Sequence, residues 1–392
     1  MSAPQPSVLV VNAGSSSLKV KLLPEGLSLM VERIGTAAAA LEGAGRDAVT
    51  RRLGNHGEAL EACLERLGVD ALAGLVAGGH RVVHGGERDT EPTRIDDEGI
   101  RALEELSALA PLHNPANLEA IRAARRLLPG TAQVAVFDTA FHATLPPRAF
   151  LYGLPRRLYE EEGIRRYGFH GTSHDFVTRE AARALGRPRE ALRLVSLHLG
   201  NGASAAAVAR GRSVDTSMGL TPLEGLLMGS RTGDLDPGVL LHLLRNGLST
   251  NELAALLNQE SGLKGLSVLS NDMRDLRAAA RAGHRAAGQA IAVFCYRVRK
   301  TIGAYAAAMG GLDAVVFTGG IGENDAATRA EAVAGLDFLG ISLDEARNRA
   351  QARLISLEAS RVAVLVVPTD EEGMIAAAAR RLLGGASREG RA

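Results

Sequence analysis

The sequence predicts an α/β fold built from two related halves. Short apolar runs rich in β-branched residues recur along the chain, each bounded by Gly, Asn or Asp, as is typical of strands buried on both faces. They alternate with longer segments of helical periodicity, which favours sheets that are mainly parallel. At ~150 residues per domain, a chain of 392 residues corresponds to two domains or three.

Five apolar runs are the predicted core strands, and three longer segments are the predicted helices between them. The strands are expected at Val8–Val11, Val134–Phe137, Leu194–Leu197, Ala314–Phe317 and Val362–Val367. The helices are expected at Gly57–Gly68, Asn117–Leu128 and Ala278–Gly310. The last nine residues, from Gly384 onward, are expected to be a frayed tail.

A short internal similarity supports duplication. Val8–Val20 reads VLVVNAGSSSLKV and Leu194–Val208 reads LVSLHLGNGASAAAV. Each segment is an apolar strand, a turn of Gly, Asn and Ser, and a second run of small and apolar residues. Two such units predict a duplicated fold with one phosphate loop in each half.

Composition excludes several classes of protein. Because 45 basic residues nearly cancel 44 acidic ones, no overall charge attracts nucleic acid or anionic lipid. Apolar runs such as Val362–Pro368 are far shorter than the ~20 residues of a membrane span, and the first residues lack a secretory signal pattern. Cys63 and Cys295 form no disulfide framework and no metal-spaced pair. We therefore expect a cytoplasmic protein that binds neither membrane nor nucleic acid.

Three loops rich in Gly follow predicted strands. In Asn12–Lys19, Gly and Ser let backbone N–H groups approach an anion and Lys19 adds charge; the alternative is a tight hairpin. The spacing is not that of a Walker A loop. For His198–Ser204 taken by itself, a hairpin with an Asn-Gly turn is the favoured interpretation. Thr318–Asn324 offers Glu and Asn to a ribose or base, and it lacks the register of a Rossmann dinucleotide site.

Two arginines and a histidine lie in turns rich in Gly. The planar guanidinium groups of Arg81 and Arg231 could each bind a carboxylate or phosphate, or each could pair with an acidic residue on the surface. His170 lies between glycines and is four residues from His174. Zinc binding by this pair is disfavoured because no third ligand is near, and donation to a developing negative charge is the better interpretation.

Two carboxylates stand where predicted strands end. Asp138 follows VAVF, and Glu371 follows the apolar run that ends at Pro368. Ligands of α/β sheets bind at the carboxyl ends of parallel strands, and oxygen donors there suit Mg²⁺ together with a substrate phosphate. Glu371 would also be favoured at a helix N-terminus by the helix dipole, and the two roles are compatible.

Together these segments resemble the acetate kinase (acetokinase) family over roughly residues 8–375. The matching strings occur in the family's order, whereas Pro24 to about Ala73 matches poorly and is shorter than usual. The strings are VNAGSSSLK, GHRVVHGG, APLHNP, VFDTAFH, YGFHGTSH, HLGNGAS, DTSMGLTPLEGLLMGSRTGDLDP, LSNDMRD, FTGGIGEN and PTDEE.

The resemblance implies a duplicated actin-like ATPase (ribonuclease H-like) fold, with two domains around a nucleotide cleft. Residues 1–138 plus 373–392 would form the N-terminal half, and residues 139–372 the nucleotide-binding C-terminal half. It also implies a homodimer that transfers the γ-phosphoryl group of ATP reversibly to acetate, giving acetyl phosphate and ADP. Mg²⁺ would be the metal, with Mn²⁺ as a possible substitute.

Roles are carried over from the family motif by motif. Asn12 and Glu371 would lie at the metal, and Asp138, His170 and Arg231 would be catalytic. The acetate pocket would comprise Arg81, Val83, Leu112, Phe169 and Pro222. ATP would contact Lys19, His198, Leu199, Gly200, Asn201, Gly202, Asp272, Met273, Arg274, Gly320, Ile321, Gly322, Glu323 and Asn324. Met273 stands where the family commonly has Phe.

The chemistry needs charge stabilisation more than proton transfer. Acetate is already ionised at pH 7, so the nucleophile needs no general base, and we expect Asp138 to orient an arginine or a metal-bound water. Propionate or another short-chain acid is an alternative acceptor, because one methylene is worth only ~1–3 kcal/mol of discrimination. A non-catalytic nucleotide-binding member of the actin-like fold is a remote alternative, since no residue of the reaction is missing.

Overall fold

The computed structural model describes residues 5–108 and 114–389, so the predicted acetate-pocket residue Leu112 lies outside the described residues. The chain divides into two compact units, which we call the first unit (Met1–Ala140 with Asp370–Ala392) and the second unit (Phe141–Thr369). The chain returns to the first unit at Asp370, whereas the predicted return is at residue 373. The return comes earlier because helix α16 (Glu371–Glu389) belongs entirely to the first unit.

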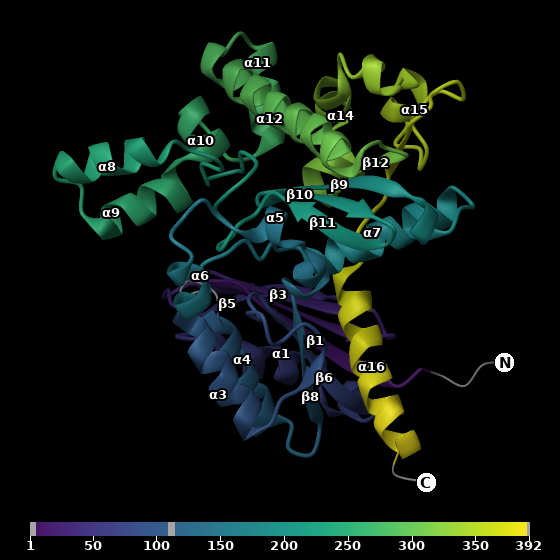
Figure 1. The fold of residues 1–392 in the computed structure, drawn as a ribbon. Coiled ribbons are helices and arrows are strands. Elements are labelled where there is room, and N and C mark those ends of the chain that lie inside the picture. The colour runs from purple at the N-terminus through teal and green to yellow at the C-terminus, as the bar shows by residue number, and fades with distance from the viewer. Residues whose placement is uncertain (1–4, 109–113, 390–392) are drawn as a thin grey trace. The chain divides into compact units, whose positions relative to one another are not determined.

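In its described residues, the first unit contains an eight-stranded sheet of order β5-β4-β3-β2-β1-β6-β8-β7 (Figure 1). The strands are β1 (Ser7–Ala13), β2 (Ser17–Leu23), β3 (Leu27–Glu32), β4 (Ala39–Gly43), β5 (Arg46–Arg51), β6 (Leu75–Val82), β7 (Thr93–Arg94) and β8 (Ala132–Phe137). The helices besides α16 are α1 (His56–Leu67), α2 (Val69–Leu72), α3 (Asp97–Glu105), the 3₁₀ turn η1 (Leu106–Ala108) and α4 (Asn114–Leu127).

Strand β1 is buried on both faces because its alternate residues enter different cores. Leu9 and Val11 pack in a cluster with α1 and α4. Val8 and Val10 pack in another with Ile375 of α16. The predicted run Val8–Val11 is therefore confirmed as a doubly covered strand.

The second unit, described throughout, has a five-stranded sheet of order β11-β10-β9-β12-β13. The strands are β9 (Arg193–Leu199), β10 (Ala203–Ala209), β11 (Arg212–Thr216), β12 (Ala314–Thr318) and β13 (Ala363–Val366). The α-helices are α5 (Pro147–Phe150), α6 (Arg157–Glu162), α7 (Gly171–Ala184), α8 (Pro237–Arg245), α9 (Thr250–Ala255), α10 (Gly262–Ser267), α11 (Met273–Arg281), α12 (Arg285–Met309), α13 (Gly319–Asn324), α14 (Ala326–Val333) and α15 (Glu345–Arg349). Short turns of other helix types are η2 (Ala140–Thr144), η3 (Arg189–Ala191), η4 (Leu256–Glu260) and η5 (Asp337–Leu339). Helix α7 and helix α12 lie on opposite faces of this sheet (Figure 1).

The two sheets share one pattern, which confirms the predicted duplication. In β3-β2-β1-β6-β8 the first two pairings are antiparallel and the last two are parallel. The order β11-β10-β9-β12-β13 repeats that pattern pairing for pairing. The two similar segments of the sequence are the hairpins β1–β2 and β9–β10 at corresponding places in this pattern.

Three expectations about elements are wrong. The sheets are not mainly parallel, because β2 to β5 form an antiparallel meander; β2 alternates buried and half-buried residues, so it is covered on one face only. The predicted helix Ala278–Gly310 is broken at Gly283, which has φ +91°, and His284 caps the start of α12. The expected tail from Gly384 is helical to Glu389, because glycines at a helix end weaken the helix without breaking it.

Among residues 5–108 and 114–389, no helix combines the length and the apolar character that a membrane span needs.

Candidate active site

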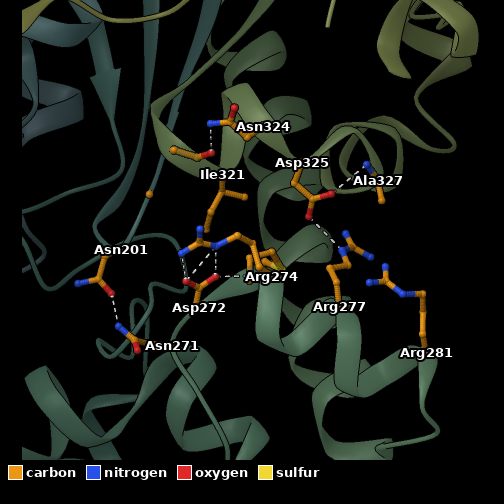
Figure 2. A pocket seen from close by; sticks show the side chains of 13 residues that line it. Asn201, Asn271, Asp272, Arg274, Arg277, Arg281, Ile321, Asn324, Asp325 and Ala327 are labelled. Carbon is orange, nitrogen blue, oxygen red and sulfur yellow. Dashed lines mark hydrogen bonds and ion pairs between the residues drawn. The ribbon is translucent and has the colours of Figure 1, made fainter. Parts of the chain in front are cut away.

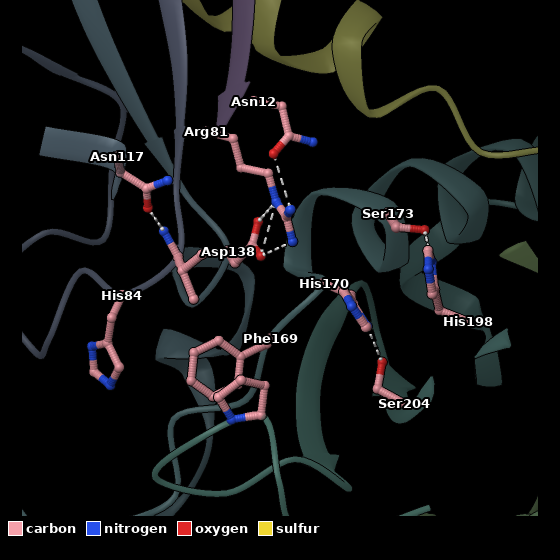
Figure 3. Close-up of polar contacts among 12 residues, drawn as sticks. Asn12, Arg81, His84, Asn117, Asp138, Phe169, His170, Ser173, His198 and Ser204 are labelled. Atoms are coloured by element: carbon pink, nitrogen blue, oxygen red, sulfur yellow. Dashed lines mark hydrogen bonds and ion pairs between the residues drawn. The ribbon is translucent and has the colours of Figure 1, made fainter. Parts of the chain in front are cut away.

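The first unit brings together three polar side chains from the carboxyl ends of its parallel strands. Arg81 lies near the end of β6, Asp138 follows β8 directly, and Asn12 lies near the end of β1. The Arg81 guanidinium donates through Nε and Nη2 to Asp138, at 2.9 Å and 2.5 Å, and through Nη1 to Asn12 Oδ1 at 3.2 Å (Figure 3). Neighbouring strand ends meet at one edge of the sheet, as α/β ligand sites require.

The Arg81–Asp138 pair is largely shielded from water. The Asp138 side chain is 1 % exposed and that of Arg81 is 21 % exposed. Burial by itself lowers the pKa of Arg81, but the carboxylates of Asp138 and Glu371 raise it above its ordinary value, so the guanidinium stays charged. A bidentate pair in these surroundings fixes the plane of the guanidinium.

Glu371 is the first residue of α16, where the helix dipole favours its charge. Burial raises the pKa of the Glu371 carboxyl above its usual value, although the nearby Arg81 lowers it. A buried carboxylate that is costly to ionise gains from a bound cation. Lys19, on β2, forms an ion pair with Glu372 instead of extending from the turn.

The Asn12–Lys19 segment contains the turn of the β1–β2 hairpin, closed by the Gly14 N–H donating to Ser17 O at 2.8 Å. Val83 follows β6 and donates its N–H to Asn117 Oδ1, while Asn117 Nδ2 donates to Ala13 O. Asn117 therefore ties the ends of β1 and β6 together. The sequence contained a signal for this role, because Asn117 is a polar residue on the apolar face of the predicted helix Asn117–Leu128.

In the second unit, His170 lies in a backbone conformation that is rare for a residue with a side chain. Its φ is +56°, immediately before helix α7 begins at Gly171. The ring stacks on that of His198 with 4.3 Å between centroids, and His170 Nδ1 lies 2.9 Å from Ser204 Oγ (Figure 3). Strained residues of this kind cluster at functional sites.

Gly202 lies between His170 and Arg231. A Cβ on Gly202 would lie 3.5 Å from His170 Nε2 and 3.7 Å from Arg231 Nη1. Arg231 is steadied by donating Nη1 to Pro222 O at 3.0 Å. An imidazole nitrogen and a guanidinium thus flank the place where a side chain at position 202 would lie.

The zinc interpretation of His170 and His174 finds no support in the geometry. Both rings bond to the same Ser204 hydroxyl. Among the described side chains, no group of three or more His, Cys, Asp or Glu is placed to hold a metal ion.

A pocket of about 660 Å³ lies in the second unit (Figure 2). Eight of the residues predicted to contact ATP line it: Gly200, Asn201, Asp272, Met273, Arg274, Gly320, Ile321 and Asn324. The others are outside its lining, namely Lys19 in the first unit, and His198, Leu199, Gly202, Gly322 and Glu323. Glu323 turns its carboxylate to the backbone N–H groups of Gly319 and Thr369, at 2.9 Å and 3.3 Å.

The segment predicted as the loop Thr318–Asn324 is mostly the short helix α13, which places Ile321 over the pocket. In Figure 2 the Ile321 side chain extends from α13 toward the pair formed by Asp272 and Arg274. The Asp272 carboxylate accepts from Arg274 Nη2 at 2.5 Å. Hydrogen bonds from Arg274 lower the pKa of Asp272, so the carboxylate is charged.

Five lining residues were not predicted: Asn271, Arg277, Arg281, Asp325 and Ala327. Arg277 donates to Asp325 Oδ2 at 3.0 Å and to Glu331 Oε1 at 2.6 Å. The sequence contained a signal for Arg277 and Arg281, because they follow Arg274 of the Asp-x-Arg motif at helical spacing.

Comparison with known proteins shows the family to which this chain is related. The model of the acetokinase family matches residues 7–377. An acetate kinase of Caldanaerobacter subterraneus subsp. tengcongensis is 49 % identical over 401 residues, covering 96 % of this chain and 99 % of that protein. The crystal structure of acetate kinase from Porphyromonas gingivalis matches with a TM-score of 0.90 at 42 % identity, over 97 % of this chain and 100 % of that one.

A propionate kinase from Francisella tularensis subsp. tularensis SCHU S4 also has a TM-score of 0.90, at 39 % identity, over 95 % of this chain and 99 % of that one. The family match covers residues of both units. The chain belongs to the acetokinase family.

Proposed function

We propose that this protein transfers the γ-phosphoryl group of ATP reversibly to acetate, giving acetyl phosphate and ADP. The observation that carries the proposal is that the charged groups such a transfer needs are present and held by neighbours. Arg81 is oriented by Asp138 in the first unit, and His170 and Arg231 flank Gly202 in the second. A carboxylate acceptor is already ionised, so the protein has to bring two anions together and stabilise the moving charge.

Arg81 is the proposed partner of the acetate carboxylate. Asp138 takes Nε and Nη2, so the fork is held in one plane while further N–H groups remain for a ligand. Asp138 thereby acts as the group that orients Arg81, not as a base. In the first unit the buried Val83 supplies apolar surface of the kind that suits a methyl group. In the second unit the buried Phe169 and the half-buried Pro222 each do so as well.

His170 and Arg231 are the proposed donors to the transferring phosphoryl group. Their nitrogen atoms face the space left by Gly202, and donors fixed before the reaction stabilise developing charge most effectively. Each such donor contributes several kcal/mol to transition-state stabilisation.

Asn12 and Glu371 are the proposed protein ligands of Mg²⁺. They offer an amide oxygen and a buried carboxylate, the oxygen donors this ion prefers, and Mg²⁺ takes one or two carboxylates besides water and substrate phosphates. Bound there, the ion would supply electrostatic stabilisation of phosphate charge. Glu371 binds it most strongly in its ionised form, which the adjacent Arg81 favours.

The 660 Å³ pocket is the proposed nucleotide site. Ile321 and Met273 offer apolar contact to a flat base, and Asn324 and Asp272 offer hydrogen bonds. Arg277 and Arg281 add positive charge at its lining, which suits a polyanionic ligand. Lys19 and Glu323, both engaged in ion pairs or hydrogen bonds of their own unit, would have to exchange those partners to reach ATP.

Propionate is the second candidate acceptor, supported by the propionate kinase structure that this chain resembles. Discrimination by one methylene is modest, so the two acids would differ in rate more than in kind.

The proposal is tested by trapping acyl phosphate with hydroxylamine. Purified protein is incubated with ATP, Mg²⁺ and acetate, propionate or butyrate, and the hydroxamate is measured against time. We expect acetate to give the highest kcat/KM, with propionate slower. Protein that binds ATP and forms no acyl phosphate from any of these acids would overturn the proposal, and a preference for propionate would favour the second candidate.

The proposed assembly is a homodimer in which α8 forms part of the contact. Four apolar side chains in and beside this helix are between 38 % and 53 % exposed: Leu235, Val239, Leu241 and Leu244. Surface patches of this kind are typical of protein contacts. Sedimentation of Leu241→Glu should give a smaller species than the unmodified chain, and equal sedimentation would place the contact elsewhere.

A further inference from the structure

A chain of hydrogen bonds runs from the buried strands of the second unit to His170. Ser204, on β10, bonds through Oγ to both His170 Nδ1 at 2.9 Å and His174 Nε2 at 2.8 Å. On its other side, His174 Nδ1 lies 2.9 Å from Ser196 Oγ on β9. Ser196, Ser204 and His174 are fully buried. We call Ser196, His174 and Ser204 the serine–histidine chain.

His174 is electrically neutral within this chain. Burial, together with the neighbouring His142 and His198 rings, holds the pKa of His174 well below its ordinary value. A neutral imidazole has one N–H donor and one acceptor nitrogen, so it passes on the direction of the hydrogen bonds along the chain.

Two directions are possible, and they differ at Ser196. In the first, Ser196 O–H donates to His174 Nδ1, His174 Nε2–H donates to Ser204 Oγ, and Ser204 O–H donates to His170 Nδ1. In the reverse direction His174 Nδ1–H donates to Ser196, and the Ser196 hydroxyl needs another acceptor. No other side-chain bond of Ser196 occurs among the residues described. A buried donor without an acceptor is strongly disfavoured.

A third arrangement, in which both rings donate to Ser204, leaves the Ser204 proton without an acceptor in the same way. Only the first direction gives every donor of the serine–histidine chain an acceptor. It makes Nδ1 of His170 an acceptor and therefore places the proton of the neutral ring on Nε2. That nitrogen is the one beside Arg231 Nη1 at Gly202.

We propose that the serine–histidine chain sets the tautomer of His170, so that Nε2–H is presented as a donor to the transferring phosphoryl group. Ser204, His174 and Ser196 are positioning residues, since they act through His170. In the opposite tautomer, a lone pair would face phosphate oxygens and repel them. The donor role rests on the proposed function, whereas the tautomer itself does not.

The direct test is nitrogen NMR of protein labelled with ¹⁵N-histidine and free of substrates. The His170 signals are assigned by their loss in His170→Gln. We expect Nδ1 of His170 to have the signal of an unprotonated nitrogen and Nε2 that of a protonated one. A protonated Nδ1 would overturn the proposal; the tautomer is measured on the unaltered protein, and His170→Gln serves only to assign the signals.

Two variants test the chain through its effect on the reaction. Ser196 is separated from His170 by two hydrogen-bonded residues, so Ser196→Ala removes only the preference for one direction. We expect comparable amounts of the two tautomers and a kcat about twofold lower. Ser204→Ala removes the link, and kcat should fall about 100-fold. In both, the KM values for ATP and acetate should stay within about twofold, because the donor acts on the charge of the transition state.

The matched control is Ser360→Ala, which removes a hydroxyl that bonds to Gly340 O and Val362 O in the same unit. It should leave both the His170 spectrum and kcat unchanged. A kcat and spectrum unaltered in Ser196→Ala would overturn the proposal. If the wild-type tautomer is as expected and the wild type makes no acyl phosphate, the proposed function fails and the tautomer assignment stands.

Discussion

Some N–H donors of Arg81 are bound by neighbouring side chains, and the others remain for the proposed substrate. Nε and Nη2 bind Asp138, and Nη1 binds Asn12. Asp138 follows β8 and Asn12 lies on β1, so the strands on both sides of β6 hold the guanidinium and leave it little freedom to rotate. A group held in this way loses little entropy when it binds a carboxylate.

The role of Asp138 is tested by Asp138→Asn, which keeps an acceptor oxygen and removes the charge. Because Arg81 loses its bidentate partner, we expect acetate KM to rise and kcat to fall by about 100-fold or more. Steady-state hydroxamate assays measure both constants. Asp97→Asn, at a partner of Arg125 that is 81 % exposed, is the control and should match the wild type. Near-full turnover by Asp138→Asn would show that the carboxylate orients nothing important.

The two arginines should differ in the kinetic constants they affect. We expect Arg81→Ala to raise acetate KM and lower kcat, and Arg231→Ala to act mainly on kcat. Removing Arg81 also leaves a buried carboxylate without its ion-pair partner, at about 3–5 kcal/mol of unfolding free energy, so urea unfolding accompanies the assays. An acetate KM that does not change in Arg81→Ala would remove Arg81 from the carboxylate site.

At the scale of elements, the hairpin β9–β10 positions both the turn residue Gly202 and the serines behind His170. Ser196 lies on β9 and Ser204 on β10, with both side chains on the same side as α7. Alternation along the two strands therefore places these hydroxyls in register with one helix.

Gly202→Ala tests whether the space in this turn is used. The added methyl would lie 3.4 Å from His170 Cε1 and 3.7 Å from Arg231 Nη1, at or near ordinary contact distances, so the fold should tolerate it. We expect kcat/KM for ATP to fall at least about tenfold while thermal unfolding changes little. Gly153→Ala, where a Cβ meets nothing within 4 Å, is the control. Full activity in Gly202→Ala would mean that the phosphoryl group passes elsewhere.

At the scale of the whole molecule, each unit has a buried histidine that resists protonation. Burial lowers the pKa of His80, in the first unit, to about 4, and does the same for His142 in the second. Unfolded histidines titrate near 6.5, so between pH 6.5 and 4 the unfolded chain binds more protons than the folded one.

Stability should therefore fall as the pH falls through this window. Protonation of each of the two histidines should lower the free energy of unfolding by about 3 kcal/mol at pH 4. Above pH 7 their contribution to stability should change little. Urea unfolding followed from pH 7.5 to pH 5 measures the slope. His80→Asn should make the slope shallower by the contribution of one proton. Equal stability at pH 5 and pH 7.5 would contradict the assignment.

The sequence alone determined the local features of this protein. Continuous apolar runs identified β1, β8, β9, β12 and β13, because a strand covered on both faces needs no alternation. Strands β3, β4 and β5 were missed, because none of them is a continuous buried run. The motifs also predicted eight of the residues that line the 660 Å³ pocket.

Only the tertiary structure decided which side chains meet. Arg81 and Asp138 are 57 positions apart, and Ser204 is 34 positions from His170. Periodicity reports the direction of a side chain from its own backbone, whereas these contacts depend on the order and pairing of strands, to which the whole chain contributes. For the same reason, nothing in the sequence indicated that Ser204, a serine among alanines, forms hydrogen bonds with two histidines.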